Sequence, residues 1–69
     1  MVEVFRTNIR RRSQGKMLLS LLSEAFPSFK INFDLSDRDK ILRAEGECVE
    51  PEKIILFMEE SGFECGVVE

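Results

Sequence analysis

Histidine is absent from this chain of 69 residues, and so are tryptophan and tyrosine. A chain without imidazole has no histidine general acid or base, no Ser–His or Cys–His nucleophile pair and no histidine ligand for zinc. Six phenylalanines supply all of the aromatic packing. We predict that the protein is not an enzyme and that it carries no cofactor.

Cysteine is scarce as well, because the chain has only Cys48 and Cys65. Two cysteines are too few for the disulfide-dense scaffold of a small secreted domain. No apolar run approaches the roughly 18 residues that span a bilayer, and the N-terminus lacks the basic-then-apolar pattern of a signal peptide. The sequence therefore predicts one soluble domain over residues 1–69, cytoplasmic and without membrane insertion.

Charge is unevenly placed along the chain. Residues 1–16 carry five basic residues against Glu3, a net charge of +4, whereas residues 45–69 carry eight glutamates against Lys53, a net charge of −7. Such asymmetry is typical of an interaction surface, or of two solvated faces that aid solubility. The pI of about 5.0 argues against a nucleic-acid partner, because nucleic-acid binders are usually basic across a whole face.

Four segments have the composition or alternation of strands, at residues 2–9, 29–35, 40–45 and 63–68. The second is the clearest, because its apolar residues alternate strictly and share one face: Phe29, Ile31, Phe33 and Leu35. The polar turn at residues 36–39 joins the second and third segments into a hairpin with one apolar side.

Two segments have the period of amphipathic helices. Residues 13–26 begin at Ser13, a predicted N-cap, and end before Pro27, whose ring cannot continue a helix. The predicted apolar stripe consists of Met17, Leu18, Leu21, Leu22, Ala25 and Phe26. A second helix is predicted from Pro51, which suits the first turn, to Gly62, a left-handed C-terminal cap. Its predicted inward face is Ile54, Phe57, Met58 and Ser61, with Ile55 and Leu56 beside it.

The predicted order is strand, helix, strand, strand, helix, strand. Each helix has one apolar stripe and each strand roughly one apolar face, so two helices packed on one side of a four-stranded sheet bury all of them. Right-handed crossovers then give an α+β fold, the ferredoxin-like βαββαβ sandwich with an antiparallel sheet.

Several stretches resemble one known family. They are Val4-Phe5-Arg6-Thr7-Asn8-Ile9, the leucine-rich helix with Phe26-Pro27-Ser28-Phe29 after it, Pro51-Glu52-Lys53-Ile54, and Glu59-Glu60-Ser61-Gly62-Phe63. Over nearly the whole chain the sequence is similar to the heavy-metal-associated domain, the family of small copper chaperones and of the N-terminal domains of metal-transporting ATPases. The matching features are mostly features of the fold, and the resemblance implies the same βαββαβ sandwich.

In that family a Met-x-Cys-x-x-Cys loop between the first strand and the first helix binds a soft ion such as Cu(I) through two thiolates. The resemblance places Ile9 at the methionine position, Arg11 at the first cysteine and Gln14 at the second. Neither thiolate is present, and a guanidinium group repels a cation. We therefore predict a degenerate member of the family that has lost its metal-binding cysteines.

The same loop carries three consecutive arginines at a predicted helix start. Free backbone N–H groups and the helix dipole attract anions there, and guanidinium groups add bidentate donors for carboxylate or phosphate. The candidate site consists of Arg10, Arg11, Arg12, Ser13 and Lys16. The main hypothesis is a binding module, monomeric or weakly dimeric, that docks an unknown protein or anionic ligand through this loop or through a sheet edge. The alternative for the loop is an exposed segment that serves solubility alone.

Two other functions stay open at this point. One is soft-metal binding or transport through Cys48 or Cys65, including a site shared across a dimer. We expect Cys65 to point inward, Cys48 to be more exposed, and the two sulfurs to lie beyond disulfide range, as free thiols. The other is a small acyl-phosphate hydrolase, which fold analogy and the arginine-rich loop suggest. The acidic residues Asp34, Asp37 and Asp39 are interpreted as a solvated turn rather than a calcium site.

Overall fold

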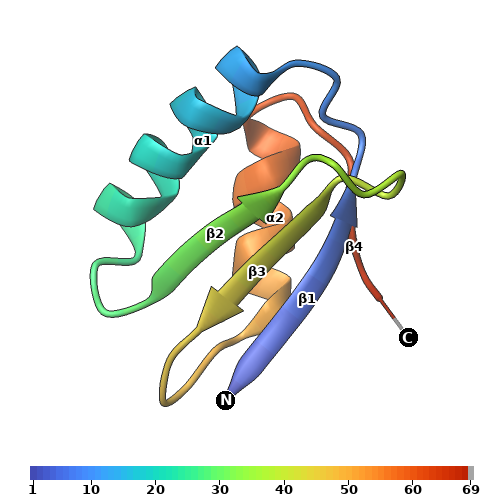
Figure 1. Cartoon of the computed structure of the whole chain (residues 1–69). Coiled ribbons are helices and arrows are strands. Elements are labelled where there is room, and N and C mark those ends of the chain that lie inside the picture. The colour runs from blue at the N-terminus through green and yellow to red at the C-terminus, as the bar shows by residue number, and fades with distance from the viewer. Residues whose placement is uncertain (69) are drawn as a thin grey trace.

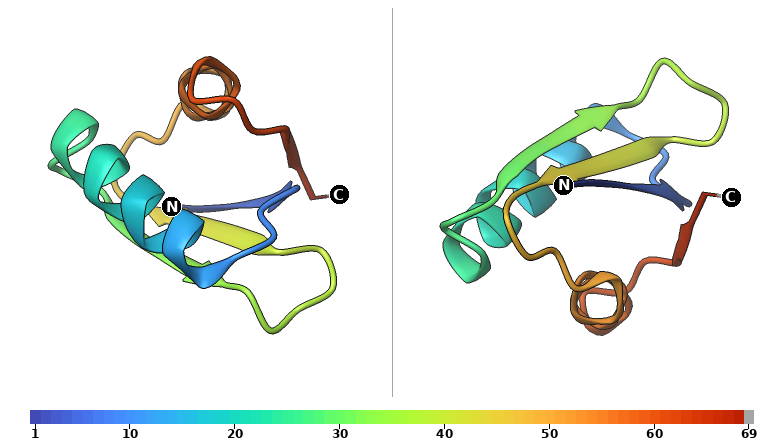
Figure 2. Two further views of the ribbon diagram at one scale, coloured as in Figure 1. Left: turned by 90° about the horizontal axis from the view of Figure 1, so that it is seen from above. Right: turned by 90° about the horizontal axis from the view of Figure 1, so that it is seen from below.

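A computed structural model describes residues 1–68 of the chain. Its elements are β1 (Val2–Thr7), α1 (Arg12–Ala25), β2 (Lys30–Asp34), β3 (Ile41–Glu45), α2 (Pro51–Glu60) and β4 (Cys65–Val67), in the predicted order (Figure 1). The strands form one sheet in the order β2-β3-β1-β4. All neighbouring strands are antiparallel, and the two helices cover one face of the sheet (Figure 2). The predicted ferredoxin-like α+β fold is confirmed.

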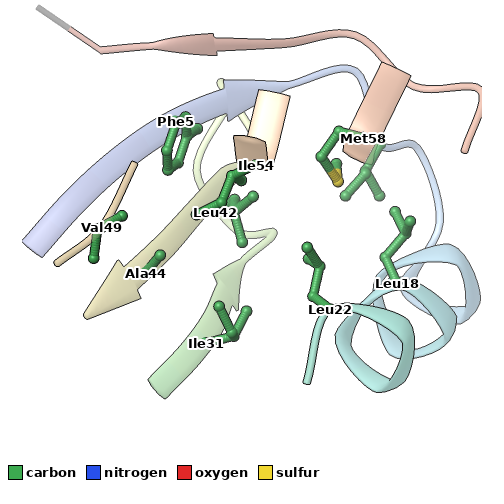
Figure 3. Close-up of a cluster of buried hydrophobic side chains, with 10 residues drawn as sticks. Phe5, Leu18, Leu22, Ile31, Leu42, Ala44, Val49, Ile54 and Met58 are labelled. Atoms are coloured by element: carbon green, nitrogen blue, oxygen red, sulfur yellow. The ribbon is translucent and has the colours of Figure 1, made fainter. Parts of the chain in front are cut away.

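The strand register aligns the apolar residues of the sheet on the side of the helices. Leu42 of β3 lies opposite both Phe5 of β1 and Phe33 of β2, and Ala44 lies opposite Ile31. The core that results joins these residues to both helices and two loops (Figure 3). Its buried members are Phe5, Ile9, Leu18, Leu22, Ile31, Leu42, Ala44, Val49, Ile54 and Met58. Burial of each large side chain in this set stabilises the fold by roughly 1.5–3 kcal/mol.

Helix α1 begins one residue earlier than predicted, and the predicted Ser13 cap is wrong. The N-cap is Arg11, and Ser13 lies inside the first turn. The reason is Gln14, whose Oε1 accepts hydrogen bonds from the backbone N–H groups of Arg10 and Arg11, both at 3.0 Å. A glutamine at the third helical position commonly reaches back in this way, and here it fixes the helix start without a serine cap.

The buried stripe of α1 is narrower than predicted. Leu18 and Leu22 are fully buried, but Met17 is 49% exposed, Leu21 is 40% exposed and Ala25 is exposed. The helix contacts β2, and its Gly15 lies against Leu35, the residue directly after that strand. An ideal Cβ at Gly15 would stand 2.9 Å from Leu35 Cδ1, so glycine permits this close approach. Rotated in this way, α1 turns Met17 and Leu21 away from the sheet.

Helix α2 follows the prediction at both ends. Pro51 occupies the first turn, and Gly62 has a φ of 93°, in the left-handed region. The N–H of Gly62 donates to the carbonyl of Glu59 and that of Phe63 to the carbonyl of Met58, each at 3.0 Å. These two bonds define a Schellman motif. Leu56, predicted beside the inward face, is instead 56% exposed.

All four strands are shorter than predicted, since β2 is Lys30–Asp34 rather than 29–35 and β3 is Ile41–Glu45 rather than 40–45. Strand β1 ends at Thr7, because Asn8 and Ile9 turn into the loop before α1. Strand β4 starts at Cys65 rather than at residue 63, because Phe63 closes the C-terminal cap of α2. These two ends lie side by side, and the Asn8 Oδ1 accepts a hydrogen bond from the N–H of Glu64 at 2.9 Å.

Candidate functional site

The loop from residue 8 to residue 11 is anchored at its base. Ile9 is buried in the core at 1% exposure, and its N–H donates to the Thr7 Oγ1 at 3.3 Å. The hydroxyl of Thr7 in turn donates to the carbonyl of Lys40 at 2.7 Å, which ties the end of β1 to the hairpin turn. The backbone is therefore held in place directly before the arginines of the loop.

All five residues of the predicted anion site are exposed, and they adjoin one another at the start of α1. They are Arg10, Arg11, Arg12, Ser13 and Lys16. The prediction of a loop over residues 10–16 is wrong in part, because α1 begins at Arg12 and only Arg10 and Arg11 precede it. We keep the name basic loop for residues 10–16. The backbone N–H groups of Arg10 and Arg11 are already bonded to Gln14. The first-turn donors that remain for a ligand are the N–H groups of Arg12 and Ser13.

The electrostatics of the basic loop favour an anion. The first turn of α1 contains no acidic residue. Within residues 1–68 the one ion pair joins Lys53 Nζ to Glu50 Oε2 at 2.7 Å, so no arginine of the basic loop has a carboxylate partner there. The positive end of the helix dipole adds to these charges. The basic loop thus holds several cations that repel one another. A bound carboxylate or phosphate would reduce this repulsion.

A cavity of about 420 Å³ lies next to the basic loop, between α1 and β2. Arg12 and Lys16 of α1 line it on one side, and Phe33 and Leu35 line it on the other. Leu19, half-buried on α1, also faces this space. The cavity combines basic side chains with an apolar wall, and it fits a ligand segment that carries both a carboxylate and an apolar group.

The sequence had indicated the parts of this cavity but not their assembly. The alternation of residues 29–35 placed Phe33 and Leu35 on the inward face, and the arginines marked the loop. Neither pattern shows that α1 shifts over β2, which is what brings Leu19 and Lys16 beside Leu35. Gln14, the residue that shapes the loop, has a local signal that was missed, because a glutamine three residues after the cap is typical of a helix start.

One acidic residue, Asp34, borders the same cavity. Its Oδ1 accepts hydrogen bonds from the Ser36 hydroxyl at 2.6 Å and the Ser36 N–H at 3.2 Å. These bonds lower the pKa of the Asp34 carboxyl, which therefore stays charged at neutral pH. Asp37 is used locally too, because its Oδ1 accepts from the N–H of Asp39 at 2.9 Å. The interpretation of these aspartates as a solvated turn stays a prediction.

The two cysteines are free thiols, as predicted, and they lie far apart. Cys48 is exposed and shares a cavity with Met1, whereas Cys65 is half-buried and pairs with Thr7, at the other end of β1. Strand β1, which has six residues at about 3.3 Å each, separates these ends by well more than the roughly 7 Å between Cα atoms that a disulfide allows. Burial, and to a lesser extent the charge of Glu59, raises the pKa of the Cys65 thiol to about 12. The thiolate that would bind a soft metal therefore forms less readily at Cys65 than at a cysteine with the ordinary pKa of 9.0.

Comparisons with known proteins add no functional assignment to this geometry. Within residues 1–68, no helix has the length and apolar character needed to cross a membrane. No group of three or more cysteine or acidic side chains that could hold a metal ion occurs in this part of the chain. No family model matches the sequence, and no curated protein or solved structure matches it either. The resemblance to the heavy-metal-associated domain stays a prediction from the sequence, and the function must be argued from the basic loop itself.

Proposed function

We propose that this protein is a non-enzymatic binding module that docks an acidic segment of a protein partner through the basic loop. The observation that supports this function best is the start of α1, where exposed arginines have no acidic neighbour in the first turn. Guanidinium groups bind carboxylates through paired, charge-assisted hydrogen bonds. Arg10, Arg11, Arg12 and Lys16 would each contribute a charge, and Ser13 a backbone donor.

An acidic protein segment fits the loop better than a lone phosphate does. Sites built for phosphate present a run of free backbone N–H groups, and here Gln14 occupies those of Arg10 and Arg11. The basic side chains are also spread over more than one helical turn, from Arg10 to Lys16. The adjoining cavity offers Phe33 and Leu35 to an apolar side chain. An extended segment with several carboxylates and one apolar residue would use all of these features.

The family resemblance, taken with this geometry, supports a proposal for the evolutionary origin of the basic loop. If the chain descends from a heavy-metal-associated domain, Arg11 and Gln14 stand at its two cysteine positions. In this chain Gln14 stabilises the helix start, and Arg11 supplies a positive charge. We propose that the position that binds a cation in the family binds an anionic partner here, on the same backbone frame.

The test is an amide NMR titration of the reduced protein with a short synthetic peptide rich in glutamate that contains one leucine. We expect shifts confined to residues 9–16 and to the part of β2 that borders the cavity. Arg11→Glu should abolish them by reversing a charge at the centre of the loop. Arg38→Glu is the matched control, because it makes the same change in net charge at an exposed arginine of the hairpin turn.

Two further additions to the same sample distinguish the alternatives. Inorganic phosphate should shift these amides only weakly, and tight phosphate binding would replace the proposal with a small-anion site. Cu(I) should leave the amides near Cys48 and Cys65 unchanged, and shifts there would favour metal binding instead. If the peptide moves no amide of the basic loop, or if Arg38→Glu weakens binding as much as Arg11→Glu does, the proposed function is wrong.

A further inference from the structure

Strand β2 is the one full-length free edge of the described sheet. It pairs with β3 alone, at the end of the strand order (Figure 1). The opposite edge, β4, is only three residues long, and short edge strands resist pairing. Strand β2 pairs with β3 residue for residue without a bulge, and it contains no proline and no residue with positive φ. Its outer row of backbone groups therefore pairs with no other strand of the described sheet, and from Asn32 to Asp34 it borders the cavity that Arg12 and Lys16 line.

The residues along this edge are complementary to themselves. The strand reads Lys30-Ile31-Asn32-Phe33-Asp34, with a cation and an anion at equal distances from the central asparagine. We propose that a second copy of this chain pairs its own β2 antiparallel to this edge, with Asn32 opposite Asn32. In that register Lys30 of each copy lies opposite Asp34 of the other, and Ile31 lies opposite Phe33. Opposite charges and apolar pairs across strands each stabilise a sheet by roughly 0.2–1 kcal/mol.

Both charged side chains are available for these pairs. Lys30 is exposed and forms no ion pair within residues 1–68, although Glu45 of β3 lies opposite it in the sheet. Asp34 is exposed, and its bonds to Ser36 use only one of its two carboxylate oxygens. The apolar row of the same strand faces the helices, where Ile31 is 8% exposed and Phe33 is half-buried. Pairing of the two copies would thus form two charge pairs on the open face of the sheet. On the face that the helices cover, it would form a continuous apolar row.

The proposed pairing has two-fold symmetry, so the assembly ends at two copies. A two-fold axis through the Asn32 pair, perpendicular to the sheet, keeps the helices of both copies on the same side. The two sheets then form one continuous sheet, with the two α1 helices antiparallel to each other on either side of the junction. Because each copy uses the same edge, the contact is isologous and stops at a dimer. The central register allows backbone hydrogen bonds whichever alternate residues of β2 direct their N–H groups outward.

A second copy fits this edge better than an acidic peptide does. An acidic strand added here would place a carboxylate beside Asp34, whereas another β2 places Lys30 there. The proposed dimer and the proposed docking site share a border, because Phe33 and Asp34 of β2 also line the cavity beside the basic loop. They use different charged groups, since the dimer pairs Lys30 with Asp34 whereas the acidic peptide binds the arginines before and within the start of α1. The two proposals can therefore fail separately.

The first test is the dependence of mass on concentration, measured by sedimentation equilibrium. Wild type should shift from monomer to dimer as concentration rises. Lys30→Glu sets two carboxylates against each other at both ends of the paired strands, and Asp34→Lys sets two ammonium groups against each other there. Each variant alone should therefore stay monomeric. An equimolar mixture should dimerise again, because every cross-strand pair between the two variants is then of opposite charge. A wild type that stays monomeric at millimolar concentration, or a mixture that does not dimerise while both variants keep native amide spectra, would overturn the proposal.

The second test reads the register directly. In a Cys48→Ser background, Asn32→Cys should form a disulfide-linked dimer on mild oxidation, since opposed Cα atoms in antiparallel strands lie about 4.5–5.5 Å apart. Lys30→Cys is the matched control, because its two copies would lie four residues apart along the strands, about 13 Å. Equal cross-linking of both variants would exclude the proposed register. Lys30→Glu should bind the acidic peptide as wild type does. A loss of that binding would show that the dimer contact and the peptide site are the same surface, which would overturn the dimer proposal as a separate contact.

Discussion

Cys65 is the residue whose ionisation is most changed by the fold. It is half-buried beside Thr7, and burial together with Glu59 raises the pKa of its thiol from 9.0 to about 12. In the unfolded chain the thiol loses its proton near pH 9, whereas in the folded chain it keeps the proton until about pH 12. Its contribution to stability is therefore fully present below pH 9 and is lost as the pH rises between these values.

We predict that Cys65→Ala flattens the loss of stability at alkaline pH. Chemical denaturation of wild type and variant at a series of pH values from 7 to 11 measures the effect as a difference in the free energy of unfolding. The difference between them should change as the pH passes about 9, the ordinary value for a cysteine thiol. Cys48→Ala is the matched control, because it removes the exposed thiol. If both variants follow the same profile, the proton on Cys65 is not what couples stability to pH.

At the scale of elements, the start of α1 links stability to the proposed function. Gln14 accepts hydrogen bonds from two backbone N–H groups there, and the first turn has no acidic residue to offset the positive end of the helix dipole. A carboxylate at the same position would accept those bonds more strongly and interact favourably with the dipole, by about 0.3–1 kcal/mol. The same carboxylate would also compete with an acidic ligand for the arginines beside it.

We predict that Gln14→Glu changes stability and binding in opposite directions. Its free energy of unfolding should rise, and its affinity for the glutamate-rich peptide should fall several-fold. Gln14→Ala, which removes both accepted bonds, should instead lower stability by about 0.5–2 kcal/mol, the usual effect of losing a helix cap. Thermal unfolding and the peptide titration measure both quantities on the same samples. A Gln14→Glu variant that gains stability and binds the peptide more tightly would contradict the electrostatic account of the loop.

Elements also show how far the sequence could be interpreted. The alternation of Phe29 to Leu35 and the glycine at position 62 predicted β2 and the end of α2, because both signals are local and strong. The cap of α1 was predicted wrongly, because Ser13 and Gln14 both satisfy local rules and only Gln14 reaches the free N–H groups. The exposure of Met17 and Leu21 depends on where α1 rests on β2, and the candidate cavity depends on the same placement. No pattern within a single segment contains that information.

At the scale of the whole molecule, the polar and apolar parts of the chain are cleanly separated. No polar or charged residue among residues 1–68 is buried, and the core is formed by apolar side chains alone. The one ion pair of this part of the chain, between Lys53 and Glu50, is exposed and contributes little to stability. The net charge of −3 conceals a basic N-terminal segment and an acidic C-terminal one. The fold thus depends on apolar burial, whereas both proposed interactions depend on exposed charge.

High salt should therefore weaken the binding of the acidic peptide while leaving the stability of the fold nearly unchanged. The Debye length falls from about 10 Å at 0.1 M ionic strength to about 3 Å at 1 M, so exposed charges barely interact at the higher value. Between these conditions we expect the affinity of the basic loop for the glutamate-rich peptide to fall at least several-fold, while the midpoint of thermal unfolding changes little. Peptide titration and thermal unfolding in sodium chloride measure the two. Binding that persists at 1 M would mean that the apolar wall of Phe33 and Leu35, rather than the arginines, provides most of the affinity.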